Sequence, residues 1–97
     1  MTSTDRVALP FSIEAEKACL GAVLIDPKYL AEIDDLLEPS DFYVKFHQVV
    51  FAAMRSIASD GMTPDILLVH ERLSADQSYV DSGSAAALSR LMVGIPR

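Results

Sequence analysis

The chain holds 97 residues, of which 51% are hydrophobic, so it can build one small domain around a core. That length excludes a Rossmann domain, a TIM barrel and a complete RecA-like motor, each of which needs far more chain. Eight basic and 14 acidic residues give a net charge of −6, of which −5 falls on residues 1–45. Direct nucleic-acid binding is therefore not expected, because phosphate binding needs clustered lysine and arginine, whereas a basic protein partner fits this charge.

The cysteine content and the hydropathy pattern indicate a cytoplasmic protein. Cys19 is the single cysteine, so an internal disulfide is excluded. The N-terminal segment lacks a basic region ahead of a long apolar run, which argues against a signal peptide. Membrane association is not expected either, since no stretch approaches the roughly 18–20 apolar residues of a membrane span.

The first half of the chain predicts an extended arm and two helices. Residues 1–11 form the arm, and residues 12–97 form the helical domain. Ser12 is a typical N-cap, and the helix that follows carries apolar residues on one face. Asp26-Pro27 predicts a second start, because proline suits the first helical position. This second helix carries Leu30, Ile33 and Leu37 and is expected to end near Pro39.

The second half predicts three more helices. A central helix from about Lys45 has the best periodic stripe of the chain, and Gly61 is a natural stop after it. Thr63-Pro64-Asp65 predicts a fourth start, whereas residues 74–82 are polar and predict a loop. Gly83-Ser84 opens a last helix that ends at Gly94-Ile95-Pro96.

These patterns indicate an all-α fold, a compact bundle of five to six short helices with no period-2 strand. The core is expected from the apolar positions of the helical stripes. Its predicted members are Leu20, Leu24, Leu30, Phe46, Val50, Phe51 and Ile57.

Titratable and nucleophilic residues offer weak signals for chemistry. His47 and His70 could form a metal pair with Asp65 or Glu71, but no pair has i, i+4 spacing, so a structural histidine is favoured. Cys19 lacks the positive surroundings of a reactive thiol, which favours a buried structural role. Glu14 and Glu16 point apart on a helix and are interpreted as favourable charges at its start.

A run of acidic residues follows the second predicted start. Its members Glu32, Asp34, Asp35 and Glu38 form either a solvated helix face or a docking surface for a basic partner. The four glycines of the chain are scattered and form no phosphate loop. The residues thus predict no catalytic, cofactor or metal site in this chain, and they indicate an acidic helical interaction domain.

Several motifs in order resemble the N-terminal domain of DnaB-family replicative DNA helicases. Leu9-Pro10-Phe11 and Ser12-Ile13-Glu14-Ala15-Glu16, with Leu20-Gly21, are similar to that family's arm and its S-x-E-A-E-x-x-x-L-G. Asp41-Phe42-Tyr43 with His47 matches D-F-Y-x-x-x-H, and Gly61 with Pro64 and Asp65 corresponds to G-x-P-[IV]-D. The resemblance covers about residues 9–97. It departs at Gly83-Ser84, where the family has Gly-Gly, and at Ala85–Ala87, which replace an aromatic residue.

The resemblance implies a collar domain without a terminal helical hairpin, which would follow in the longer protein. It implies partners: other helicase subunits in a hexamer arranged as a trimer of dimers, and a DnaG-type primase. ATP and Mg are expected for the full-length motor only. The alternatives are a helicase-binding domain of a primase and a stand-alone helical adaptor in the replisome.

Within this resemblance, Phe42, Tyr43 and His47 are expected to form a structural corner between helices. His47 would anchor that corner through a hydrogen bond. Without the hairpin, the chain is expected to be a monomer or a weak dimer in dilute solution.

Overall fold

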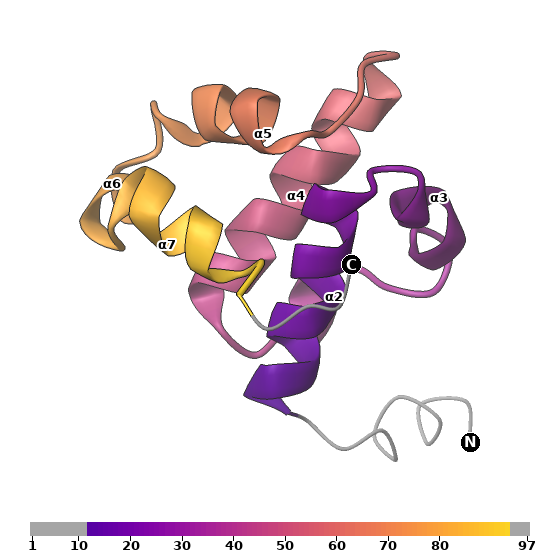
Figure 1. Ribbon diagram of the computed structural model, residues 1–97, viewed down its shortest axis with the longest axis horizontal. Coiled ribbons are helices and arrows are strands. Elements are labelled where there is room, and N and C mark those ends of the chain that lie inside the picture. Colours follow the sequence, from indigo (N-terminus) through magenta and orange to yellow (C-terminus); the bar gives the residue numbers. More distant parts are fainter. Residues whose placement is uncertain (1–11, 94–97) are drawn as a thin grey trace.

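The computed structural model describes residues 12–93, and within them every regular element is a helix (Figure 1). The all-α prediction is therefore confirmed. The predicted arm at residues 1–11 and the predicted stop at Gly94-Ile95-Pro96 lie outside the described residues. No helix among residues 12–93 has the length and apolar character needed to cross a bilayer.

Helix α4 (Lys45–Ser59) is the central element, and four others pack around it. It contacts α2 (Ile13–Ile25), the 3₁₀ helix η1 (Pro39–Asp41), α5 (Ile66–Leu73) and α6 (Gln77–Asp81). In Figure 1, α2 and α3 lie on one side of α4, while α5, α6 and α7 lie on the other. The predicted central helix thus divides the domain into two halves.

Local capping sets the bounds of three helices at or near the positions that the sequence predicted. The side chain of Ser12 accepts the backbone N–H of Ala15 at 3.2 Å and starts α2. Asp65 accepts the N–H of Leu68 at 2.9 Å and starts α5. Gly61 follows the end of α4 with φ of 81°, a left-handed conformation that glycine adopts without steric cost.

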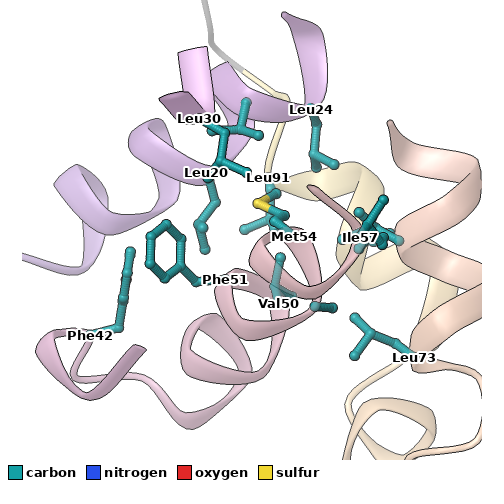
Figure 2. Close-up of a cluster of buried hydrophobic side chains, with 14 of the residues drawn as sticks. Leu20, Leu24, Leu30, Phe42, Val50, Phe51, Met54, Ile57, Leu73 and Leu91 are labelled. Atoms are coloured by element: carbon teal, nitrogen blue, oxygen red, sulfur yellow. The ribbon is translucent and has the colours of Figure 1, made fainter. Parts of the chain in front are cut away.

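The core fills the space between α4 and its neighbours (Figure 2). Phe46, also predicted there, is half-buried and packs against the edge of the core. Each fully buried Leu, Val, Ile or Phe side chain contributes about 1.5–3 kcal/mol to stability, so this cluster dominates the energetics of the fold. The predicted core residues that lie fully inside it are Leu20, Leu24, Leu30, Val50, Phe51 and Ile57.

The second predicted helix is much shorter than expected. Helix α3 spans only Tyr29–Ile33, and the chain then passes through a turn to η1. The helix ends well before Pro39, which accounts only for the extended backbone of Glu38, with φ of −114° and ψ of 157°, because the residue before a proline avoids helical geometry. Leu30 and Ile33 still reach the core, whereas Leu37 packs only at its edge.

The prediction of a loop over residues 74–82 is wrong, because α6 (Gln77–Asp81) forms there. Asp76 caps it by accepting the backbone N–H groups of Ser78 and Tyr79. Tyr79 is 1% exposed and stacks on Phe46, with ring centroids 6.0 Å apart and planes 5° apart. Tyr79 is the one buried side chain of this short helix, so the helix has no periodic apolar pattern from which it could be predicted.

The last helix, α7 (Ser84–Arg90), begins at the predicted glycine. Gly83 has φ of 113°, and a Cβ at this position would lie 3.4 Å from the Cβ of Ala87. Ala87 and Leu88 are buried, as is Leu91 just after the helix. The positive φ, rather than a lack of space, is therefore what favours glycine at the entry into α7.

Candidate functional site

The predicted corner between α2 and α4 is built from two inward side chains and one outward side chain. Phe42 is buried, and its ring centroid lies 5.0 Å from that of Phe51. His47 is buried as well, at 5% exposure, whereas Tyr43 is 70% exposed. Phe42 and His47 also meet edge to face, with ring centroids 6.4 Å apart and planes 80° apart, while the side chain of Tyr43 faces outward.

Glu16 of α2 is the residue that joins this corner to the rest of the domain. Its Oε2 accepts the backbone N–H of Tyr43 at 2.7 Å, and its Oε1 accepts the N–H of Val44 at 3.3 Å. The same Oε1 lies 2.8 Å from Nδ1 of His47, and both side chains are at most 10% exposed. One carboxylate thus meets three donors at the start of α4, where the helix dipole also favours a negative charge.

The interpretation of Glu16 as a charge at the start of its own helix is therefore incomplete. Its partners lie 27 to 31 residues away in the chain, so the spacing of residues along α2 could not predict these contacts. The sequence held one signal for this contact: Glu16 and His47 each belong to a motif of the family resemblance. Gln48 adds a further tie, because its Nε2 donates to the carbonyl oxygen of Phe42 at 2.7 Å.

The two histidines have separate environments. His47 pairs with Glu16 between α2 and α4, while Nδ1 of His70 lies 2.7 Å from the hydroxyl of Tyr79 between α5 and α6. Burial raises the pKa of Tyr79, which keeps this hydroxyl protonated. Over residues 12–93, no three His, Cys, Asp or Glu side chains group closely enough to hold a metal ion.

Cys19 is half-buried on α2 and packs against the core. Burial raises the pKa of its thiol, because the thiolate loses hydration in these surroundings. A raised pKa lowers the fraction of reactive thiolate at neutral pH. The side chain therefore behaves as a small apolar residue.

The predicted acidic surface is partly neutralised by an arginine. Arg55 of α4 places Nε 2.7 Å from Oδ1 of Asp34 and donates from its terminal nitrogen to Oε1 of Glu38 at 3.0 Å. The hydrogen bond to Glu38, together with the charges of both carboxylates, raises the pKa of Arg55. Glu32 and Asp35 are exposed. The structure therefore divides the predicted surface into two carboxylates bound to Arg55 and two in solvent.

An open groove of about 620 Å³ lies beside these ion pairs, on the outward face of α4. We call it the α4 groove, and its lining residues are Asp34, Pro39, Ala52, Arg55, Ser56, Ala58 and Ser59. Arg72 of α5 borders it, donating to Oγ of Ser56 at 2.6 Å and to Oδ2 of Asp60 at 3.0 Å. The sequence reasoning missed this feature, because its two sides come from separate elements.

Comparison with known proteins places these features in context. A family model described as the DnaB-like helicase N terminal domain matches residues 8–97. A replicative DNA helicase DnaB from Geobacillus stearothermophilus is 40% identical over 87 residues, which is 90% of this chain and 19% of the relative. A second, from Treponema pallidum, is 36% identical over 87 residues, 90% of this chain and 20% of the relative. The chain thus spans about a fifth of the length of these curated relatives.

A solved structure agrees with these sequence matches. The crystal structure of the N-terminal domain of DnaB helicase from Mycobacterium tuberculosis is similar, with a TM-score of 0.83 and 29% sequence identity. The similarity covers 90% of this chain and 60% of that one. The helical arrangement described above is therefore the one found in that domain.

Proposed function

The chain belongs to the DnaB-like helicase N-terminal domain family, and from this premise we propose that it is the protein-docking collar of a replicative DNA helicase. The match over residues 8–97, in relatives that are replicative helicases, is the observation that carries this proposal. The collar supports hexamer assembly and recruits a DnaG-type primase. It works in the cytoplasm and leaves duplex unwinding to the motor of the full-length protein, which uses ATP and Mg.

The architecture supports the role of a rigid platform. A docking domain transmits orientation between partners only if its own elements do not shift, and the buried core and the Glu16 bridge tie α2, the corner and α4 together. The net charge of −6 favours a partner with basic surface patches, since charge complementarity steers association.

The experiment that tests the proposal is binding of the 97-residue chain to the cognate DnaG-type primase by isothermal titration calorimetry. We expect saturable binding that weakens with added salt, because an acidic surface contributes to it. An absence of binding at high protein concentrations would argue against primase recruitment.

The source gene provides an independent check. A Walker A segment encoded downstream of Arg97 would agree with the collar of a helicase. A zinc-binding region and a primase core encoded upstream would instead assign the chain to a primase.

A further inference from the structure

The turn between α4 and α5 carries the one aspartate of the chain that is followed by glycine. Asp60 and Gly61 come directly after the last residue of α4, at the edge of the domain (Figure 1), and both are exposed. Glycine has no Cβ, so the backbone nitrogen of Gly61 is not shielded by a side chain of its own residue. That nitrogen is therefore free of steric hindrance toward the neighbouring side-chain carboxyl group.

Such a pair can rearrange its peptide bond without an enzyme. The nitrogen of Gly61 forms a bond to Cγ of Asp60, and the amide hydrogen leaves with a carboxyl hydroxyl as water. Water then opens the five-membered succinimide ring at one of its two carbonyl carbons. Attack at Cγ restores aspartate, whereas attack at the former backbone carbonyl leaves the main chain running through Cβ and Cγ, which is isoaspartate. One water is released and one is consumed, so the mass of the chain is unchanged.

The folded structure holds both reacting groups in hydrogen bonds. The N–H of Gly61 donates to the carbonyl oxygen of Ala58 at 3.0 Å. Oδ2 of Asp60 accepts from Nη1 of Arg72 at 3.0 Å, and the same nitrogen donates to Oγ of Ser56 at 2.6 Å. Ring closure requires the nitrogen and the carboxyl group to leave these partners, so the rate depends on how often the turn opens.

Little in the surroundings opposes this opening. The side chains of Asp60 and Arg72 are 51% and 32% exposed, and an ion pair at such a surface contributes little to stability. A Cβ built on Gly61 would meet nothing within 4 Å, so the turn has room to move. Local opening of a helix end costs far less free energy than unfolding of the whole domain. The ion pair to Arg72 is thus the contact that restrains the carboxyl group.

We propose that Asp60–Gly61 is a site of spontaneous aspartyl isomerisation and that Arg72 sets its rate by holding the carboxylate away from the backbone nitrogen. Isoaspartate adds one atom to the main chain, so the product alters the turn that leads from α4 into α5. The inference concerns a covalent modification and does not depend on the proposed docking function.

The test follows the reaction in the 97-residue chain at neutral pH and physiological temperature over several weeks, in buffer and in urea. Samples are unfolded and digested with a protease that cuts before aspartate but not before isoaspartate. We expect the uncut fraction at Ser59–Asp60 to grow in buffer and to grow faster in urea. Asp81–Ser82 is the internal comparison, because its carboxylate is exposed but the Cβ of serine shields the nitrogen. No growth at Asp60 in buffer, equal rates in buffer and urea, or growth as fast at Asp81 would overturn the proposal.

A matched pair of variants tests the part assigned to the arginine. Arg72→Gln releases the carboxylate, whereas Arg90→Gln removes the same charge from an exposed position on α7. We expect Arg72→Gln to raise the rate at Asp60 by about two- to fivefold and Arg90→Gln to change it by less than about 1.5-fold, because one exposed ion pair is lost only in the first. An unchanged rate in Arg72→Gln would refute the role of Arg72. Equal acceleration at Asp60 and Asp81 in that variant would also refute it, since general unfolding would then be the cause.

Discussion

Replacement of Glu16 by alanine removes the acceptor that joins α2 to the start of α4. Two of its contacts are short, at 2.7 Å to the N–H of Tyr43 and 2.8 Å to Nδ1 of His47, and the third, to Val44, is 3.3 Å. A hydrogen bond to a charged group contributes roughly 1.5–3 kcal/mol, and a buried donor left without a partner costs a similar amount. Water can replace the carboxylate at the more exposed Tyr43 N–H, so the full sum is not lost.

We therefore expect Glu16→Ala to lower the free energy of unfolding by about 2–4 kcal/mol. A domain of this size has roughly 5–15 kcal/mol in total, so the loss is a large share of its stability. The melting temperature should fall by roughly 10–25 °C. Glu16→Gln keeps one acceptor oxygen but loses the charge, and should cost about 1–2 kcal/mol.

The measurement is urea unfolding followed by circular dichroism at the helix band, with the midpoint and slope fitted for each variant. Glu14→Ala is the matched control, because Glu14 lies in the same first turn of α2 but is exposed. This substitution removes only the favourable interaction of the carboxylate with the helix dipole. We expect its effect to be a fraction of that at Glu16. If the two alanine variants are equally stable, the bridge to α4 contributes nothing and the reasoning is refuted.

Three further predictions follow from the same features. His47→Ala should lower the melting temperature by several degrees, about 4–8 °C for each kcal/mol lost, while ATP hydrolysis by the full-length helicase stays unchanged; unchanged melting would contradict the anchoring role. Cys19 should react with a thiol-specific chromogenic disulfide more slowly in the folded chain than in urea, and faster as pH rises, because burial raises its pKa; equal rates would show an accessible thiol. Sedimentation of the 97-residue chain should show a monomer or a weak dimer, and a tight hexamer would refute this.

Elements with local signals were predictable from the sequence. The side chains of Ser12 and Asp65 accept hydrogen bonds from backbone N–H groups three residues further along the chain. Gly61 adopts the positive φ that the turn after α4 requires at that one position. The apolar stripe of α4 has a period that a neighbouring helix does not alter. Such features depend on the chain nearby, so the starts of α2, α4 and α5, the central helix and most of the apolar core positions were accessible.

Elements held by distant contacts were not predictable in this way. Helix α6 depends on the stacking of Tyr79 against Phe46, which lies 33 positions earlier in the chain. The acidic run was predicted to form a single surface. In the structure Arg55 binds Asp34 and Glu38, whereas Glu32 and Asp35 are exposed to solvent. These outcomes follow from which helix faces meet, and no local spacing encodes that.

By itself, the sequence determined the all-α class, the cap that begins α2, the start of a helix near Asp65, and a family resemblance carried by residues such as Glu16 and His47. Only the tertiary structure decided that these two side chains meet across α2 and α4, and that small residues of α4 form a groove between Arg55 and Arg72. The physical reason is the range of the interactions. Capping and periodicity act within a few residues, whereas the bridge and the groove exist only once separate helices pack together.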